Sequence, residues 1–363
     1  MYKVKVLGAG SIGNHLANAS RRRGWQVAIC DLDPAALART RNEIYPSRYG
    51  AWDEAIELYP VGDAPTSVYD LIVIGTPPDA HVDLAIEAIT EGPRAVLVEK
   101  PVCGPDLARA QEMFDLAKER GVRLFVGYDH VVGASALHAI EKARSLGRIE
   151  TLDVEFREYW GGIFAAHPWL DGPQDSYLGF WKRGGGASGE HSHAINLWQH
   201  FAQELGAGRV VEVGATLDYV KTDLVDYDRL CLLNLRTESG LVGRVVQDVV
   251  TQPPRKWARV QAEDGYVDLS IGFEPGIDRV ESKLGKAHAE EFVVEKTRPD
   301  DFIAELEHIE AVLEGRSDSR ALHIERGLDT MLVVAAAHLS AAEGRNVCID
   351  YGAGYTPAAL TTR

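Results

Sequence analysis

Cysteine is scarce in this 363-residue sequence, and the few cysteines form no pattern. They are widely separated and include no Cys-x-x-Cys pair: Cys30, Cys103, Cys231 and Cys348. A disulfide framework is therefore not expected, and a reducing compartment suits the chain. Its stability has to come from hydrophobic burial, and 45% apolar residues are enough to build the two cores that a chain of this length favours.

Long hydrophobic runs are also missing. The longest, around Met331 to Leu339, is too short to span a bilayer and contains His338, so it is interpreted as a core helix. The apolar run after Met1 is interrupted by Lys3 and Lys5, which is not typical of a signal peptide. We therefore expect a cytoplasmic protein with no membrane partner.

Positive charge is in deficit, because the formal net charge is −16. Such a chain repels a phosphate backbone, which argues against a nucleic-acid partner but leaves room for one buried anion site. The one basic cluster, Arg21-Arg22-Arg23, closes a predicted helix, where cations meet the negative end of the helix dipole. We interpret it as a solvated helix end.

Short apolar runs alternate with helical patterns in the first third of the chain. The runs are interpreted as strands: Val4–Leu7, Val27–Cys30, Leu71–Ile74, Ala95–Val98 and Leu124–Val126. The segments between them have the 3.6-residue spacing of helices: Ile12–Arg23, Pro34–Glu43, His81–Thr90 and Pro105–Arg120. This alternation predicts an α/β domain over residues 1–127, with a doubly wound (Rossmann) parallel sheet.

The pattern changes after Tyr128 to longer alternating strands. These are Thr151–Tyr159, Val210–Tyr219, Arg229–Thr237, Leu241–Val249 and Ala258–Ala262. Three helical segments accompany them: Ser188–Leu205, Asp300–Glu314 and His323–Glu343. We predict a second, α+β domain over residues 128–363, built on a large, mainly antiparallel open sheet.

A glycine motif joins the first strand to the first helix, where a dinucleotide-binding loop would stand. Gly8 permits a tight turn, Gly10 lets a pyrophosphate approach the main chain, and Gly13 lets the helix pack on the strand. The N–H groups of Ser11 and Ile12 belong to the helix start, which attracts anions. The first domain is therefore predicted to bind a dinucleotide.

Asp31 ends the second predicted strand, where a carboxylate can accept hydrogen bonds from ribose hydroxyls. Because it would repel a 2′-phosphate, we expect NAD rather than NADP, although Arg39 and Arg41 lie near enough in sequence to serve a phosphate. The alternative is that Asp31 only caps the helix that begins near Pro34. Asp33 fills that role better.

Two further turns follow predicted strands: Gly75-Thr76-Pro77-Pro78-Asp79-Ala80-His81 and Glu99-Lys100-Pro101. With Gly127-Tyr128, Gly184-Gly185-Gly186 and His193-Ala194-Ile195-Asn196, they resemble the glucose–fructose oxidoreductase, inositol dehydrogenase and MocA (Gfo/Idh/MocA) family over the whole chain. The resemblance implies that both turns line the nicotinamide end of the cofactor cleft. The implied cofactor contacts there are Thr76, Pro77, His81, Glu99 and Lys100.

Lys100 is the first candidate for chemistry, because ligands bind at strand ends of an open α/β sheet and a proline fixes the turn beside it. The second is His193, which follows a glycine-rich loop. We expect Lys100 to polarise the reacting oxygen while His193 takes the hydroxyl proton and hydride leaves the same carbon for nicotinamide C4.

The acid expected beside this histidine is displaced. Similar enzymes carry an aspartate four residues before it, but Gly189 occupies that position here. Glu190, three residues before His193 on one predicted helix, can pair with it and is the third catalytic candidate. A metal site from Glu190, His191, His193 and His200 is disfavoured, because His-x-His chelates from a strand and hydride transfer needs no metal. We therefore predict no metal.

A segment dense in aromatics and hydrogen-bonding groups, residues 158–183, suits a polyhydroxylated ring. Together with Lys100 and His193, we expect Tyr128 and His167 to contact substrate. The prediction is an NAD(P)-dependent dehydrogenase acting on a CH–OH group of a sugar, an inositol or a sugar derivative. By analogy with similar proteins we expect a homodimer or homotetramer.

Two alternatives to this activity stay open. The first is a non-catalytic sensor or regulator of the same fold, which would keep the cofactor site and lose the chemistry. The second is a reductase of an imine or a conjugated double bond, in which the histidine would be dispensable.

Overall fold

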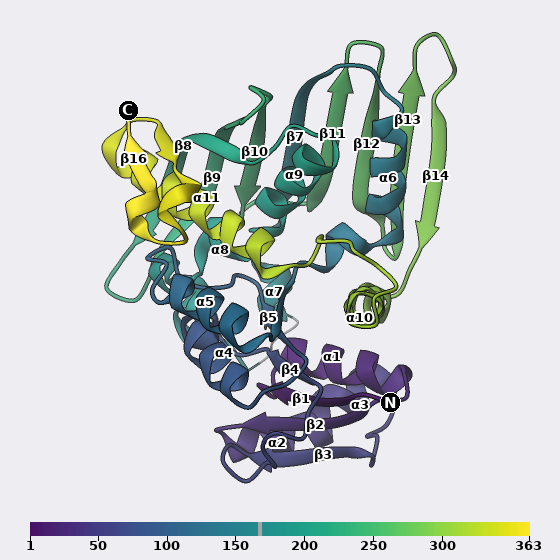
Figure 1. The fold of residues 1–363 in the computed structure, drawn as a ribbon, viewed down its shortest axis with the longest axis vertical. Helices are drawn as coiled ribbons and strands as arrows, with labels where there is room; N and C mark the ends of the chain where they lie inside the picture. The colour runs from purple at the N-terminus through teal and green to yellow at the C-terminus, as the bar shows by residue number, and fades with distance from the viewer. Residues whose placement is uncertain (166–168) are drawn as a thin grey trace.

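The computed structural model of the protein describes residues 1–165 and 169–363. Its architecture is two β-sheets, each with its own helices (Figure 1). The first sheet contains only strands from the first third of the chain, and the second contains the rest. The long helix α10 (Arg298–Leu313) returns from the second part of the chain to lie beside the first helix of the first part (Figure 1).

The first sheet has six parallel strands in the order β3-β2-β1-β4-β5-β6. Their bounds are β1 Lys3–Leu7, β2 Gln26–Asp31, β3 Ile56–Pro60, β4 Leu71–Ile74, β5 Ala95–Glu99 and β6 Arg123–Gly127. The helices are α1 Ser11–Arg22, α2 Pro34–Arg39, α3 Tyr45–Tyr49, α4 His81–Thr90 and α5 Ala110–Arg120. The predicted Rossmann sheet is confirmed, and the order in which its strands are added reverses between β1 and β4.

Sequence and structure differ in three places in this part of the chain. Strand β3 was not predicted, because its five residues alternate only weakly and end in Pro60. The second helix continues through a π-helical turn, Thr40–Ile44, into α3. Helix α5 begins five residues later than expected, because Leu107 and Arg109 both have positive φ angles that no helix accommodates.

The second sheet has ten strands in the order β14-β13-β12-β11-β7-β10-β9-β8-β15-β16. Their bounds are β7 Ile149–Arg157, β8 Val210–Lys221, β9 Asp226–Thr237, β10 Val242–Asp248, β11 Arg255–Ala262, β12 Gly265–Glu274, β13 Ile277–Leu284, β14 Glu290–Glu295, β15 Val347–Ile349 and β16 Leu360–Thr362. All neighbouring strands in it run antiparallel except β7 and β10. The predicted large, mainly antiparallel sheet is confirmed.

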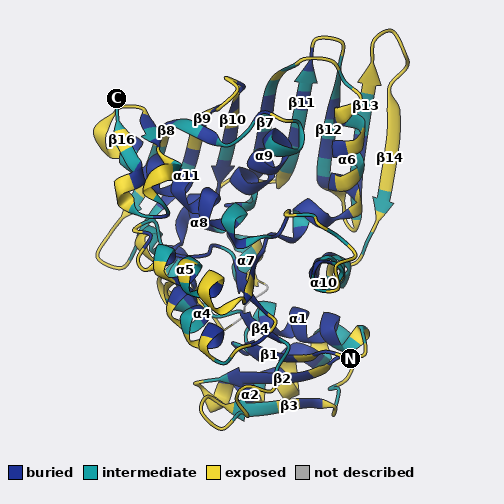
Figure 2. Ribbon diagram, viewed as in Figure 1, coloured by how far each residue is buried: buried dark blue, intermediate teal, exposed yellow. Residues whose placement is uncertain are grey.

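Helices cover one face of this sheet, as Figure 1 shows. They are α6 Ala134–Arg144, α9 His193–Glu204 and α11 Ile324–Glu343; two short helices, α7 Gly161–Ala165 and α8 Gly186–Glu190, lie nearer the first sheet. Trp198 of α9 is fully buried and donates its indole N–H to Leu152 O on β7 at 2.8 Å. Along β9, buried and exposed residues alternate, so the opposite face is open, and β14 is exposed along its length (Figure 2).

The predicted helix Ser188–Leu205 is two helices. Helix α8 ends at Glu190, His191 and Ser192 form a turn, and α9 begins at His193. The pairing of Glu190 with His193 was argued from one continuous helix, so this break removes its geometric basis. None of the helices in the described ranges has the length and apolarity that a bilayer span requires.

Candidate functional site

The glycine motif lies at the switch point between β1 and β4 and has the conformation that its sequence predicts. Gly8 has φ +106°, and a Cβ there would stand 2.6 Å from Gly75 O on the neighbouring strand. A Cβ on Gly13 would clash with the carbonyl oxygen of Gly8. A Cβ on Gly10 would meet no described atom within 4 Å. Two glycines are therefore required by the fold, while the third faces the open space that a bound pyrophosphate would need.

Helix α1 starts at Ser11, so the N–H groups of Ser11 and Ile12 have no partner within the helix. These two N–H groups lie at the first turn of α1, beside the open space at Gly10. This main-chain cradle fits the phosphates of a dinucleotide without any side-chain cation.

Asp31 is tied to this loop. Its Oδ2 accepts a hydrogen bond from Ala9 N at 2.7 Å, and its Oδ1 accepts one from Asp33 N at 2.9 Å. Asp33, not Asp31, caps α2 through Ala35 N. The carboxylate of Asp31 is partly exposed at the carboxyl end of β2, the position that the ribose interpretation requires.

The two arginines that could have served a 2′-phosphate already have acidic partners. Arg39 lies 3.6 Å from the Asp33 carboxylate, and Arg41 lies 3.0 Å from that of Glu54. Both pairs are largely exposed, so solvent screens them. The charge around the ribose end of the site is therefore set mainly by Asp31.

His81 joins the two turns that the resemblance singled out. Its buried ring lies between two carbonyl oxygens, with Nε2 2.7 Å from Thr76 O and Nδ1 2.9 Å from Pro101 O. Burial lowers its pKa, against the opposing effect of the two carbonyl oxygens. His81 thus fixes both turns, while Pro77 is exposed and the Thr76 hydroxyl has no hydrogen-bond partner among the described residues.

Lys100 follows β5 and reaches across to the second half of the chain. Its Nζ donates to Glu190 O and to Glu190 Oε2, each at 3.0 Å. The hydroxyl of Tyr177 donates to the same Oε2 at 3.2 Å. Burial favours the protonated form of Glu190, but Lys100 and His191 outweigh it and hold its pKa below the ordinary value. Glu190 is therefore the ionised partner of Lys100, and the expected pairing with His193 is wrong.

The acid nearest to His193 comes from another segment. Asp129 Oδ1 lies 4.0 Å from His193 Nδ1 and 3.5 Å from His130 Nδ1. Burial, together with His130 and Lys100, holds the pKa of His193 well below its ordinary value, and burial lowers that of His130 to about 3. Both rings are therefore neutral imidazoles at neutral pH.

Sequence reasoning missed Asp129 and His130, although a signal was present. Both directly follow β6, the neighbour of β5 in the parallel sheet, so they lie at the same carboxyl edge as Lys100. Polar residues at adjacent strand ends are typical of an α/β site.

Tyr128 supports His193 rather than lining an open surface. The ring is fully buried, its hydroxyl donates to Ser192 Oγ at 3.0 Å, and it packs edge-on against the His193 ring at a centroid distance of 5.3 Å. A substrate contact by Tyr128 would require this ring to move. The other expected contact, His167, lies outside the described residues.

Glu99 is buried at the end of β5 and faces Gly127 on β6. A Cβ on Gly127 would stand 2.6 Å from Glu99 Oε1, so only glycine leaves room for the carboxyl group. Burial, with Asp129 nearby, raises the pKa of Glu99 to about 8. Its contact with a cofactor stays a prediction.

The glycine loop of the second half closes on the first half. A Cβ on Gly184 would stand 2.9 Å from Pro78 Cβ, and Arg183 pairs with Asp79 at 2.8 Å. Both partners belong to the short 3-10 helix Pro78–Ala80 that precedes α4. These contacts hold the glycine loop where Glu190 can pair with Lys100, and His193 follows at the start of α9.

The four residues weighed as a metal site are not brought together. Glu190 pairs with Lys100, and His191 and His200 do not belong to the one group in the described chain whose atoms could hold an ion. That group is Asp129, His130 and His193.

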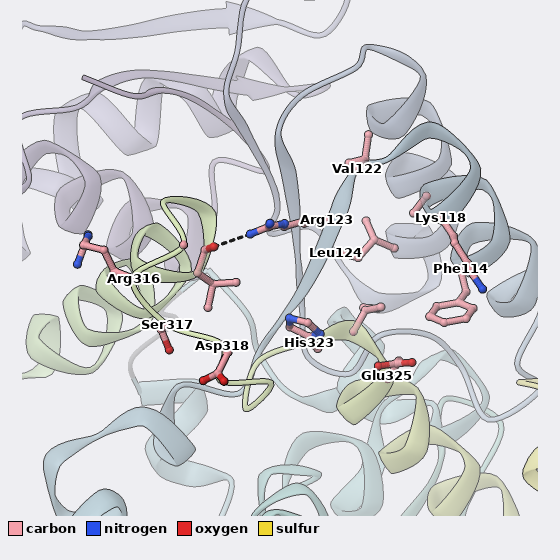
Figure 3. Close-up of a pocket in the computed structure, with 14 residues that line it drawn as sticks. Phe114, Lys118, Val122, Arg123, Leu124, Arg316, Ser317, Asp318, His323 and Glu325 are labelled. Atoms are coloured by element: carbon pink, nitrogen blue, oxygen red, sulfur yellow. Dashed lines mark hydrogen bonds between the residues drawn. The ribbon is translucent and has the colours of Figure 1, made fainter.

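A cavity of about 840 Å³ lies elsewhere, between α5, β6 and the segment that joins α10 to α11 (Figure 3). Lys118, Arg123, Asp318 and Glu325 line it, among others. None of the catalytic or cofactor residues named above belongs to its lining.

Residues 2–128 match the model of a family described as an oxidoreductase family with an NAD-binding Rossmann fold, Gfo/Idh/MocA. The first third of the chain therefore matches the NAD-binding Rossmann domain of this family. Comparison with curated proteins found no match.

Solved structures show the same two-sheet fold along almost the whole chain. A putative myo-inositol dehydrogenase from Sinorhizobium meliloti 1021 is 22% identical with a TM-score of 0.73; 96% of this chain and 100% of that chain are covered. An aldose-aldose oxidoreductase from Caulobacter crescentus, complexed with glycerol, is 21% identical with a TM-score of 0.75, covering 96% and 99%. The WlbA dehydrogenase from Bordetella pertussis, in complex with NADH and UDP-GlcNAcA, is 19% identical with a TM-score of 0.71, also covering 96% and 99%. At these sequence identities the structural similarity establishes the fold alone.

The steric difference between Gly10 and Gly13 gives a matched pair of substitutions. Gly13→Ala should lower the free energy of unfolding by about 2 kcal/mol, because its Cβ clashes with main chain that cannot move aside. Gly10→Ala should leave the melting temperature unchanged but weaken NAD binding about tenfold or more, because its Cβ enters the cofactor's space. Thermal unfolding and NAD titration by calorimetry measure the two effects, and equal NAD affinity in Gly10→Ala would contradict this placement of the pyrophosphate.

Proposed function

We propose that this protein is an NAD-dependent dehydrogenase that transfers a hydride between the nicotinamide and a secondary alcohol or ketone of a sugar, an inositol or a related polyol. The supporting observation is the meeting of two nitrogen groups from different halves of the chain. Lys100 ends a strand of the parallel sheet, His193 begins α9, and they are close enough for the Lys100 ammonium to lower the pKa of His193. The match to an oxidoreductase family supports the same conclusion.

Bound NAD would supply the hydride acceptor or donor. Lys100, held by the carboxylate of Glu190, directs a positive charge toward the substrate oxygen and stabilises the negative charge that develops there. Neutral His193 accepts the hydroxyl proton on oxidation and returns it on reduction. Asp129, facing Nδ1, favours the tautomer that leaves the lone pair on Nε2.

The substrate class rests on the groups around this pair and on the relatives. The structural neighbours reported above include a putative myo-inositol dehydrogenase, an aldose-aldose oxidoreductase and a dehydrogenase in complex with UDP-GlcNAcA. We propose a domain boundary between residues 127 and 128. We also propose that two or four chains associate through the open face of the large sheet. Apolar side chains such as Leu232 and Val242 are exposed there.

Replacing either nitrogen group tests the activity. Lys100→Ala and His193→Ala should each lower kcat by about a hundredfold or more while largely keeping NAD affinity. The assay follows absorbance of the reduced nicotinamide across a panel of sugars, inositols, uronates and nucleotide sugars. Lys221→Ala, at an exposed position of β8, and His138→Ala are matched controls outside the site and should keep full turnover. Unchanged turnover in both site variants would overturn the scheme and favour a reductase of a double bond; no turnover of any substrate by the native protein would favour a sensor.

The ion pair of Lys100 has its own test. Glu190→Gln keeps the shape and the main-chain contact of Glu190 but removes its charge, so kcat should fall about tenfold with little change in NAD affinity. Tyr177→Phe removes only the second hydrogen bond to the same oxygen and should have a smaller effect. A larger loss in Tyr177→Phe than in Glu190→Gln would argue against an ionised Glu190.

The cofactor preference depends on Asp31. The native protein should have a kcat/KM for NAD at least about tenfold above that for NADP, because the carboxylate repels a 2′-phosphate. Asp31→Asn keeps an oxygen for Ala9 N while removing the charge, so it should narrow this ratio without lowering stability. Steady-state kinetics with both cofactors measure it, and a native preference for NADP would refute the assignment.

A further inference from the structure

Three ligand atoms from two segments of the chain lie close together. They are Asp129 Oδ1, His130 Nδ1 and His193 Nδ1, and all lie within 4.8 Å of one another. Each atom is buried and has no hydrogen-bond partner among the described residues. The side chains of Asp129 and His130 are more than nine-tenths buried. Buried polar atoms are almost always satisfied, so three orphaned atoms around one point indicate a missing partner.

Four cationic side chains act on these three residues. The neighbouring lysines already have carboxylate partners: Lys100 pairs with Glu190, Lys256 with Glu158, and Lys296 with Asp278 and Asp301. Arg298 also acts on the group, from the first turn of α10, where it lies over the Phe302 ring.

Two further acids near Asp129 lack a cation of their own. Glu99 Oε1 and both carboxyl oxygens of Glu305 are buried without hydrogen-bond partners in the described chain. In addition to the effect of burial, Asp129 raises the pKa values of Glu99, Asp301 and Glu305, and Glu99 and Asp301 also raise that of Glu305. A positive ion at the three ligand atoms would relieve this repulsion.

We propose that Asp129, His130 and His193 bind a divalent transition-metal ion of the zinc type. Two neutral imidazoles and one carboxylate are ligands that Zn²⁺, Co²⁺ and Ni²⁺ prefer over Mg²⁺ or Ca²⁺, which take oxygen ligands. Tetrahedral zinc with ligands at about 2.0–2.1 Å sets them about 3.3 Å apart. The observed separations of 3.5 Å and 4.0 Å require only a small contraction. The fourth position is left for water or substrate.

This ion would use the nitrogen on which base catalysis depends. With the metal on Nδ1, neutral His193 keeps its proton on Nε2 and can no longer accept one from substrate. His193 can therefore act either as a base beside Asp129 or as a metal ligand, but not as both at once. This consequence rests on the proposed function, whereas the metal site itself does not.

Binding is tested on the full-length protein after dialysis against a chelator and then against buffer. Addition of Co²⁺ should give the visible absorption of four-coordinate cobalt at one equivalent per chain, and Zn²⁺ should abolish it and raise the melting temperature. Asp129→Asn and His130→Gln should each weaken binding at least tenfold. His200→Gln on the same helix and His138→Gln on α6 should bind as the native protein does.

The result that overturns the site is absence of saturable Co²⁺ and Zn²⁺ binding by the native protein, or binding that Asp129→Asn and His130→Gln leave intact. The melting temperature of each variant without metal shows whether it is folded. If a variant is unfolded, the native protein decides the question through the cobalt spectrum, because bound imidazole and carboxylate differ from thiolate ligands in their absorption.

Measurements of turnover with and without zinc distinguish this inference from the proposed function. Zn²⁺ should inhibit turnover reversibly, with the same midpoint as in the binding titration, and chelator should restore it. Binding without any measurable turnover would keep the metal site and reject the dehydrogenase. Turnover that saturating zinc leaves unchanged would reject the exclusive use of Nδ1.

Discussion

The partly buried ion pair between Lys100 and Glu190 connects the two halves of the site. Lys100 belongs to the edge of the parallel sheet, and Glu190 ends a short helix of the second half, so neither half alone holds the ammonium group in place. A buried carboxylate that lost its cation would carry a large desolvation cost. The remaining contacts between the glycine loop around Gly184 and the turn at Pro78 maintain the approach that this pair requires.

Much of the fold could be predicted because its signals are local. A glycine motif between a strand and a helix, and apolar runs that alternate with helical spacing, identify a Rossmann sheet from short windows of sequence. The edge strands β12 to β14 were missed, because turns and polar residues such as Glu290 and Glu291 conceal their alternation. The parallel pairing of β7 and β10 is a long-range contact that no local pattern contains.

The site was predicted less completely, for a related reason. Lys100 and His193 stand in motifs, and both are at the site. Which acid faces which of them depends on one turn at His191 and Ser192, which separates α8 from α9 and rotates Glu190 away from His193. A periodic pattern continues through such a turn, so the sequence alone suggested one helix. Asp129 lies near His193 because α9 packs against the 3-10 turn Asp129–Val132 that follows β6.

Helix α10 has a mechanical consequence. It comes from the second half of the chain, yet it packs along α1: Glu307 and Glu310 bind Arg23, and the rings of Phe302 and His15 stack with their centroids 4.8 Å apart. These contacts between α10 and α1 oppose a wide hinge opening, because separating the two helices would expose the stacked rings and break both ion pairs. We therefore expect a dinucleotide to enter and leave by displacement of loops rather than by rigid-body rotation of the two lobes.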